Sequence, residues 1–380
     1  MTTTLQQELE ALDPGLLAHL RVRGFRREQL LAWAATLAED TDRTNRLPGS
    51  VAAVPEEQLG RLPPAPSAQH ARLTALGREA LVRGELAVCV LAGGMATRMG
   101  GVVKALVEVV PGLSFLDMQL GELRQLAELY GAAPPLWLMT SEATDAPVRA
   151  ALGARCDGSA IAAFEQFVSL RLAPEGALLR DGNGAPSSYP TGHGDLPEAL
   201  RASGLLDRFR AGGGRYVWVS NLDNLGACVD ALVLGWHIDR GAALTVELVD
   251  KHPGDAGGGP VMYRGRPMIV EHFRLPREFD PEQVPVFNTN TFLVDAGALA
   301  ELRMPWTYVR VDKKVGGRVA VQFERLLGEL TAGIEPRLLR VSREGLASRF
   351  LPVKDQAALE KLRPVFVAMA ESRGLTRPGR

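Results

Sequence analysis

The stretch Leu86-Ala-Val-Cys-Val-Leu-Ala-Gly-Gly94 decides the fold class of this chain. It begins as a short apolar run rich in β-branched residues, which predicts a fully buried strand, and it breaks off at Gly93-Gly94. Two adjacent glycines let backbone N–H groups approach an anion closely, so this loop suits a phosphate, although a tight turn is the alternative. Arg98 and Lys104 add two cations at the end of the strand where open α/β sheets bind ligands.

Length and composition limit the classes of protein to consider. With 380 residues, of which 46% are hydrophobic, the chain can bury a large core in one domain or in two to three lobes. A formal net charge of −1 argues against a general nucleic-acid binder. We expect no membrane association, because no apolar run reaches bilayer length and the first residues lack a signal pattern. Three widely spaced cysteines suit reduced thiols, so we expect a cytoplasmic protein.

The segments around the first strand predict an α/β succession. Apolar residues recur at helical spacing in residues 5–37, whereas residues 41–66 are rich in Pro, Gly and Asp and predict an irregular connection. Nothing in this N-terminal part converges on chemistry, so we expect it to be a packing scaffold. Ser114 and Asp117 have the spacing of a helix capping box, and Leu136–Met139 predicts the next strand. Strand, helix and strand in this order indicate parallel strands joined by a right-handed crossover.

A carboxylate follows another expected strand, over residues 215–220. The strand ends in Asn221-Leu-Asp223, and a carboxylate at the carboxyl end of a buried strand suits Mg2+ shared with phosphates. An Asx-rich turn is the alternative interpretation of these residues.

Two further positions suit contacts with a ligand. The amide of Gln166 can donate to and accept from a pyrimidine edge at once, although a surface glutamine is the alternative. His193 lies between Gly192 and Gly194, which leave its backbone and imidazole exposed to whatever lies in front of the loop.

A polar pair lies in the C-terminal half of the chain. Asn288 and Asn290 are two residues apart, so on a strand their amides face the same side and could satisfy several hydroxyls of a hexose. Residues 319–327 predict the start of a helix with a mainly structural role.

Separated motifs across roughly residues 80 to 355 resemble, in the same order, those of the UTP-dependent sugar-1-phosphate uridylyltransferases. The family signature L-x-G-G-x-G-T-x-x-G, followed by Pro-Lys, resembles residues 91–104, with Ala96 in place of a glycine and Val103 in place of the proline. Four other family motifs, P-P-G-H-G-D, S-N-x-D-N-L-G, F-N-T-N-N and R-F-x-P-V-K, resemble residues 190–195, 220–226, 287–291 and 349–354.

The resemblance implies a Rossmann-like nucleotidyltransferase fold of the GT-A-like type, an α/β fold with a mixed sheet flanked by helices. Its expected parts are a helical N-terminal region of residues 1–84, a nucleotidyltransferase catalytic domain of residues 85–355 and a C-terminal helix within residues 356–380. A left-handed β-helical domain follows in glucose-specific members, and we expect it to be absent here because about two dozen residues remain.

The resemblance also implies a reaction, in which glucose 1-phosphate attacks the α-phosphorus of UTP in line to give UDP-glucose and pyrophosphate. The expected ligands are UTP, a sugar 1-phosphate and Mg2+, and nothing indicates a protein partner. Two alternatives stay open: a UDP-N-acetylhexosamine pyrophosphorylase and a catalytically silent nucleotide-sugar binding protein. The implied roles are catalysis by Lys104, Lys354 and His193; nucleotide binding by Leu91, Ala92, Gly93, Gly94, Met139, Gln166 and Gly192; sugar binding by Asn221, Asn288 and Asn290; and metal binding by Asp223.

Overall fold

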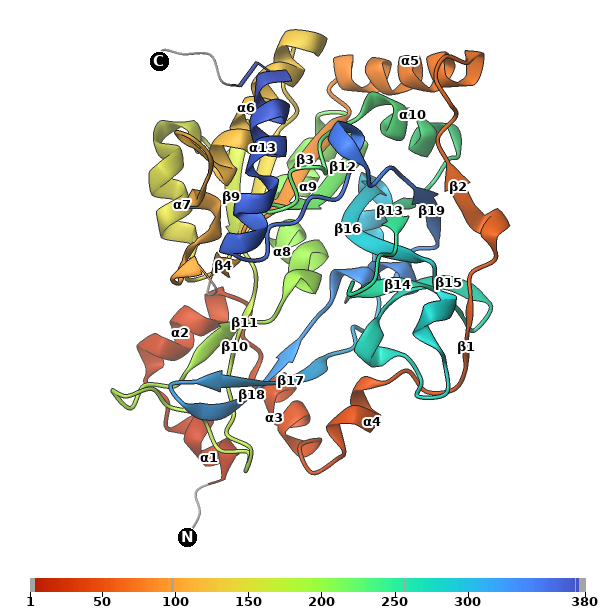
Figure 1. Cartoon of the computed structure of the whole chain (residues 1–380). Coiled ribbons are helices and arrows are strands. Elements are labelled where there is room, and N and C mark those ends of the chain that lie inside the picture. Colours follow the sequence, from red (N-terminus) through yellow and green to blue (C-terminus); the bar gives the residue numbers. More distant parts are fainter. Residues whose placement is uncertain (1–3, 97–98, 256, 373, 376–380) are drawn as a thin grey trace.

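The body of the protein is an eight-stranded mixed sheet, seen in a computed structural model that describes residues 4–96, 99–255, 257–372 and 374–375 (Figure 1). β16 runs antiparallel to both of its neighbours, and the other adjacent strands are parallel. The predicted mixed sheet is therefore confirmed. The strand order is β2 (Leu59–Arg61), β19 (Pro336–Arg340), β13 (Leu244–Asp250), β16 (Val286–Asp295), β12 (Tyr216–Asn221), β3 (Leu86–Leu91), β8 (Leu136–Thr140) and β9 (Ile161–Glu165).

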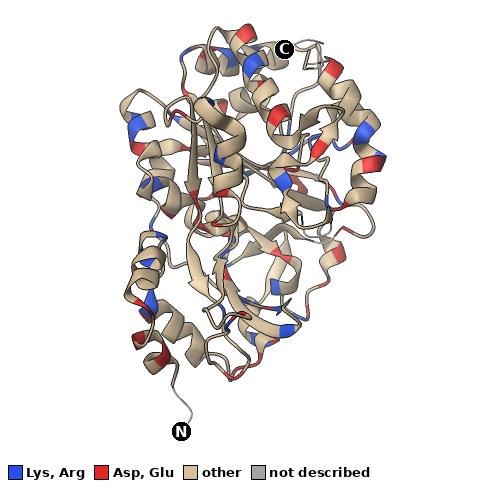
Figure 2. Cartoon of the chain, turned by 90° about the vertical axis from the view of Figure 1, so that its left-hand side faces the viewer, with Lys and Arg blue, Asp and Glu red and all other residues tan. Residues whose placement is uncertain are grey.

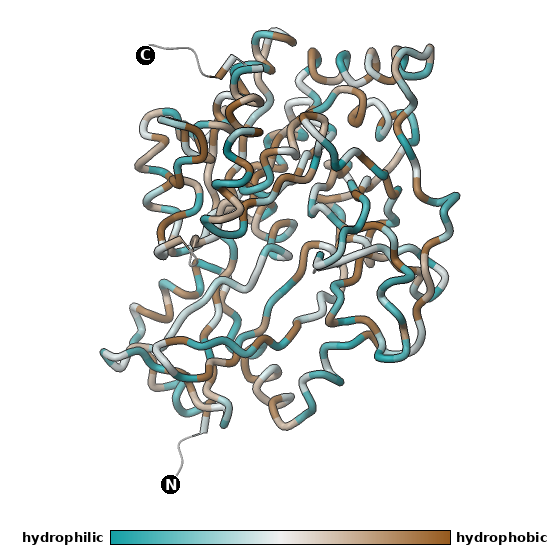
Figure 3. Tube along the Cα trace, in the orientation of Figure 1, coloured by the Kyte–Doolittle hydropathy of each residue, from teal (hydrophilic) through white to brown (hydrophobic). Residues whose placement is uncertain are grey.

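Helices cover both faces of this sheet, and its central strands are therefore buried on both sides. Along β3, Val88 contributes to one hydrophobic core and Cys89 to the other, as expected for a parallel strand between two helical layers. β3 and β8 consist mostly of buried apolar residues, and Figure 3 shows the hydropathy along the whole trace. One core contains residues of α5 (Ala68–Val82), α6 (Phe115–Tyr130), α10 (Ala231–Asp239) and α13 (Gln356–Ser372), and the other those of α8 (Leu196–Ala202), α9 (Leu205–Ala211), α11 (Ala296–Glu301) and α12 (Leu330–Gly333).

The start of α6 shows how local sequence sets these elements. Ser114 caps the helix by accepting from the backbone N–H of Asp117, and the Asp117 carboxylate accepts from the backbone N–H of Ser114. The predicted capping box is therefore confirmed. The other short elements of this part are β4 (Met95–Ala96), β5 (Val102–Val103), β6 (Glu108–Val110), β7 (Leu113–Ser114) and α7 (Asp145–Leu152).

A separate core joins the N-terminal helices to two hairpins, at the lower end of the molecule in Figure 1. Leu9, Leu20 and Leu30 of the helices pack against Val168 and Val321 of the hairpins. This core holds the two hairpins and the N-terminal helices together. Its elements are α1 (Leu5–Glu10), α2 (Pro14–Val22), α3 (Arg27–Ala35), β10 (Val168–Leu170), β11 (Ser188–Pro190), β17 (Val309–Val315) and β18 (Arg318–Glu324).

Two predictions of local structure were wrong. Residues 319–327 do not begin a helix: most of this segment is β18, which pairs with β17 along its whole length. The expected irregular connection at residues 41–66 contains ordered elements. The sequence did not predict them, because strands of three residues carry too little periodicity to be recognised. These elements are α4 (Thr41–Asn45), β1 (Val51–Ala53), which pairs with the β14 (Gly258–Tyr263) and β15 (Arg266–Glu271) hairpin, and the sheet strand β2.

Charged residues of both signs are interspersed over the helices and loops (Figure 2). Among the residues that the structure describes, no helix is both long enough and apolar enough to cross a membrane.

Candidate functional site

A cleft of about 400 Å3 lies where the parallel strands β3, β8 and β12 end. The ends are level, because Leu91 pairs with both Met139 and Asn221 in the sheet register. The lining contains most of the predicted site residues: Leu91, Gly93, Gly94, Lys104, Met139, Gln166, Gly192, His193, Asn221 and Asp223. Segments far apart in sequence therefore meet at the edge of the sheet where α/β proteins bind ligands. Arg98, the second cation expected there, lies outside the described residues.

Gly93 and Gln166 are in direct contact. A Cβ atom on Gly93 would lie 2.0 Å from Nε2 of Gln166, so only glycine leaves room for this amide. Gln166 is 7% exposed, and its side chain makes no hydrogen bond within the described part of the chain. A nearly buried amide without protein partners is available to a ligand in the cleft.

Two side-chain hydroxyls that follow β8 fix the loop backbone beside Gln166. Ser141 Oγ donates to the carbonyl of Gly93 at 2.9 Å, and Thr144 Oγ1 donates to the carbonyl of Ala92 at 3.1 Å. Ala92 also donates its N–H to the carbonyl of Met139 at 2.8 Å. These bonds preorganise the strand end and the start of the glycine loop.

Lys104 and Asp223 form an ion pair within the cleft, with side chains 18% and 20% exposed. The backbone N–H of Lys104 donates to the carbonyl of Gly94 at 3.2 Å, which ties the lysine to the glycine loop. A positive and a negative group thus lie together at the carboxyl end of β12, where phosphates and a cation could both bind.

The residues around Asp223 fit a Mg2+ ion that is bound jointly by the protein and by phosphates, rather than one bound by protein ligands alone. Among the described residues, no three His, Cys, Asp or Glu side chains are grouped so that they could hold a metal ion. Mg2+ is commonly bound through one or two carboxylates, with phosphates and water completing its shell, so one aspartate is a sufficient protein contribution. Lys104 contacts the same carboxylate and would compete with the ion.

His193 is oriented by a backbone hydrogen bond, because its Nδ1 accepts from the N–H of Leu327 at 2.8 Å. Burial lowers the pKa of the imidazole, and an Nδ1 that accepts must be unprotonated. We therefore assign the neutral tautomer with its proton on Nε2, which makes His193 a donor without a charge.

The glycines beside His193 serve a different purpose from the one expected. Gly192 has φ of 106°, and a Cβ atom there would lie 2.5 Å from the carbonyl oxygen of Arg325. A Cβ atom on Gly194 would lie 2.6 Å from Cβ of Arg325. The glycines thus let the turn pack against the end of β18, and the half-buried imidazole is positioned by that contact.

Asp195 and Arg325 connect the segment that carries Gln166 with the turn that carries His193. Oδ2 of the fully buried Asp195 accepts from the Phe167 N–H at 3.0 Å and from the Thr191 hydroxyl at 2.6 Å, and Oδ1 lies 3.0 Å from Arg325 Nε. Burial raises the pKa of Asp195 to about 7, against the opposing effect of the Arg325 charge. Asp195 thereby joins the residue after Gln166 to the turn that carries His193.

Of the predicted sugar residues, Asn221 lines the cleft, whereas Asn288 and Asn290 do not and depart from the regular alternation of a strand. Asn290 has φ of 58°, a left-handed conformation that Asn tolerates, and its Nδ2 donates to Oδ1 of Asn221 at 2.8 Å. Asn288 Oδ1 accepts from the backbone N–H of Asn290 at 3.0 Å. The two amides therefore do not project as a same-face pair of a regular strand, and neither residue lines the cleft.

Lys354 is exposed and does not line the cleft either. It lies beside the site through its backbone, because the N–H of Val353 donates to the carbonyl of Asp223 at 3.1 Å. The long lysine side chain starts one residue from this contact.

The residue that follows the N-terminal helix α2 contacts the chain on both sides of Gln166, in keeping with the expected packing scaffold. Arg23 Nε donates to Glu165 at 2.7 Å, and the carbonyl of Arg23 accepts from the N–H of Val168 at 3.0 Å. These two contacts flank Gln166 on both sides in sequence, so α2 helps to position it.

Sequence reasoning missed the part of the lining that comes from the two hairpins. Gln322 and Glu324 are two residues apart on β18, and this alternation would have placed both on one face if the segment had been interpreted as a strand. The residues concerned are Arg171, Lys313, Gln322 and Glu324.

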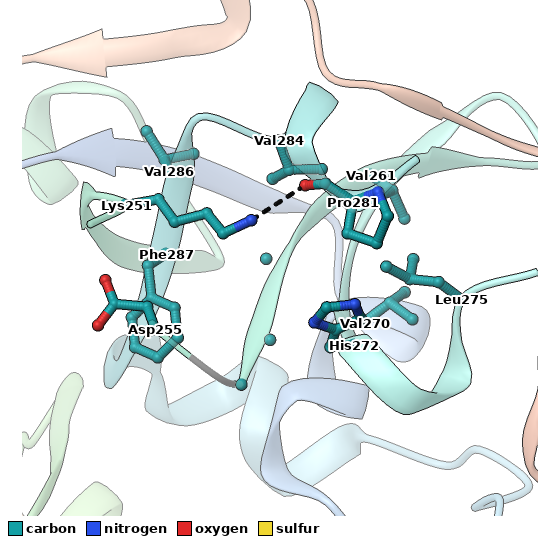
Figure 4. A pocket seen from close by; sticks show the side chains of 13 residues that line it. Lys251, Asp255, Val261, Val270, His272, Leu275, Pro281, Val284, Val286 and Phe287 are labelled. Atoms are coloured by element: carbon teal, nitrogen blue, oxygen red, sulfur yellow. Dashed lines mark hydrogen bonds between the residues drawn. The ribbon is translucent and has the colours of Figure 1, made fainter. Parts of the chain in front are cut away.

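A second cavity, under the β14–β15 hairpin, is too small for a nucleotide. Its volume is about 30 Å3, room for a water molecule or two. Val261, Val270 and Val284 line it, and Lys251 donates across its edge to the carbonyl of Pro281 at 3.3 Å (Figure 4). The cleft at the strand ends is the candidate site, because the predicted site residues gather there.

A family profile and the similar sequences of known proteins indicate the same family. The profile of the UTP–glucose-1-phosphate uridylyltransferase family matches residues 43–371. A UTP–glucose-1-phosphate uridylyltransferase of Hordeum vulgare is 32% identical over 286 residues, which cover 71% of this chain and 60% of the barley protein. The chain thus spans well under two thirds of the length of this relative.

Solved structures show the same fold at lower identity. A UDP-glucose phosphorylase of Trypanosoma brucei has a TM-score of 0.72 at 23% identity, covering 91% of this chain and 77% of that one. A putative UDP-N-acetylglucosamine pyrophosphorylase of Entamoeba histolytica has a TM-score of 0.69 at 19% identity, covering 80% and 85%. Proteins named for either sugar thus share this fold.

Proposed function

The chain belongs to the UTP–glucose-1-phosphate uridylyltransferase family, and on this premise we propose that it transfers a uridylyl group from UTP to glucose 1-phosphate. The observation that carries the proposal is the pairing of Gly93 with the Gln166 amide at the end of β3. This amide is nearly buried and has no side-chain hydrogen bond to any described residue, so it can match the alternating donors and acceptors of a uracil edge. The glycine loop beside it offers backbone N–H groups to phosphates.

The reaction needs positioning and charge neutralisation rather than a nucleophilic side chain. An oxygen of the sugar phosphate attacks the α-phosphorus in line, a new P–O bond forms, and the bond from the α-phosphorus to the bridging oxygen breaks, so that pyrophosphate leaves. Lys104 would stabilise the charge on the phosphates, and His193 would donate from its neutral Nε2–H. Preorganised donors of this kind stabilise developing charge at little cost in reorganisation.

Mg2+ belongs to this proposal with Asp223 as its protein ligand. The ion would supply charge neutralisation on the phosphates when bound. Asp223 would hold the ion, and Lys104, which contacts the same carboxylate, would contribute its ammonium group to the phosphate oxygens.

Pyrophosphate release tests the proposed function. The protein is mixed with UTP, Mg2+ and, in turn, the 1-phosphates of glucose, galactose and N-acetylglucosamine. We expect the highest kcat/KM with glucose 1-phosphate, because sites that hydrogen-bond hydroxyls reject altered analogues by up to about 10⁴. A preference for the N-acetylated sugar would identify a UDP-N-acetylhexosamine pyrophosphorylase instead. Release with none of the sugars, despite UTP binding, would identify a silent nucleotide-sugar binding protein.

A further inference from the structure

Among the residues that the structure describes, one cation in the cleft forms no ion pair. Of the described residues in the lining, Lys104, Arg171 and Lys313 carry a full positive charge. Lys104 pairs with Asp223, and Lys313 Nζ lies 2.6 Å from Glu324 Oε1. Arg171 has no carboxylate at ion-pair distance within the described part of the chain.

The Arg171 guanidinium is nevertheless held in a fixed position. Its Nε donates to Gln322 Oε1 at 3.1 Å, and its Nη1 donates to Ser187 Oγ at 3.0 Å and to the carbonyl of Ser188. Its Cζ lies 5.4 Å from the ring centroid of Tyr189. Nη2 has no hydrogen-bond partner among the described residues. One edge of a planar, oriented donor group therefore stays open.

These contacts involve neutral acceptors alone, so they orient the group without neutralising it. Burial lowers the pKa of the Arg171 guanidinium, since a half-buried cation loses hydration. An arginine stays charged in proteins, and a partly desolvated charge without a partner is unfavourable unless an anion binds to it. Planar guanidinium donors match the oxygens of a phosphate better than those of any neutral ligand.

We propose that Arg171 binds a phosphate group of the substrate, from the wall of the cleft that the hairpins β10–β11 and β17–β18 form. This inference deepens the proposed function and rests on it. It adds a phosphate contact that does not come from the glycine loop or from Lys104. The phosphate can belong to UTP or to the sugar 1-phosphate, and direct binding measurements distinguish the two.

The test is equilibrium binding by calorimetry, without turnover, of uridine, UMP, UTP and glucose 1-phosphate to the wild type and to Arg171→Met. We expect about a tenfold or greater loss of affinity for the phosphorylated ligand that Arg171 contacts, and no change for uridine. A loss with UTP assigns the contact to the nucleotide phosphates, and a loss with glucose 1-phosphate alone assigns it to the sugar phosphate. Equal losses for uridine and UTP would show a merely structural role and overturn the proposal, as would unchanged affinities throughout.

Two further variants make the result secure. Arg180 is the control, because it lies in the same connection between β10 and β11 as Arg171 but does not line the cleft. It donates to the carbonyl of Gly184 at 2.9 Å. Arg180→Met should therefore bind all four ligands like the wild type. If Arg171→Met does not fold, Arg171→Lys is measured in the same way. Lysine keeps the charge, so a phosphate role predicts a partial loss for the contacted ligand and none for uridine; equal losses overturn the proposal. A wild type that binds UTP but releases no pyrophosphate would refute the proposed function and still allow this comparison.

Discussion

Replacement of Gly93 by alanine should disable the nucleotide site without unfolding the protein. The added Cβ atom would lie 2.0 Å from Nε2 of Gln166, whereas van der Waals contact begins at 3.4 Å, so the amide must move by about 1.4 Å. Nε2 is the end of a flexible side chain, so the amide can rotate away and the fold can persist. The displaced amide would then no longer match the uracil edge.

The expected magnitude follows from this displacement. A misplacement of about 1 Å can cost about a hundredfold in rate, or about 2.7 kcal/mol. We therefore expect kcat/KM for UTP to fall by about that factor in Gly93→Ala, with Tm close to that of the wild type. Steady-state pyrophosphate release and thermal unfolding measure the two quantities.

A double-mutant cycle isolates the cause. In a Gln166→Ala background there is no amide to displace, so adding Gly93→Ala should cost little more. Gly182→Ala is the matched control, because a Cβ atom there meets no other atom within 4 Å. If the effects of Gly93→Ala and Gln166→Ala were additive, the loss would come from the loop itself and the reasoning would be refuted.

Three further predictions concern charge. Lys104→Ala should fold but turn over about a hundredfold more slowly, since one positioned cation contributes on the order of 3 kcal/mol; a variant that keeps more than about half of the wild-type kcat would remove Lys104 from the mechanism. Asp223→Asn should need more Mg2+ for half-maximal rate, and a titration that overlays the wild type would rule out Asp223 as the ligand. Burial lowers the pKa of His237 to about 3, so near pH 6.5 the unfolded chain binds a proton that the folded chain does not. The free energy of unfolding should therefore fall by about 2 kcal/mol from pH 7 to pH 5 through this residue, and urea unfolding of His237→Gln should lack that part of the decrease.

Sequence patterns predicted the centre of the fold because its signals are local. β3 is a continuous apolar run that ends in two glycines, and α6 begins at a capping box of side chains three residues apart. Such features depend on neighbours in the chain, so they can be recognised without the tertiary structure.

The hairpin wall could not be predicted because its signals are not local. β18 is a strand because β17 pairs with it, and its sequence alone is compatible with a helix. Arg171 enters the site because Gln322, distant in sequence, lies beside it. The left-handed Asn290 likewise depends on the opposing strand, where Asn221 accepts from its side chain.

The central claim is uridylyl transfer by attack of the sugar phosphate on the α-phosphorus of UTP. The most direct measurement is phosphorus NMR of the products formed from UTP, Mg2+ and glucose 1-phosphate that carries oxygen-18 in its phosphate. We predict UDP-glucose and pyrophosphate in equal amounts, with all of the label in UDP-glucose. Label in the pyrophosphate, or no UDP-glucose despite UTP binding, would contradict the account.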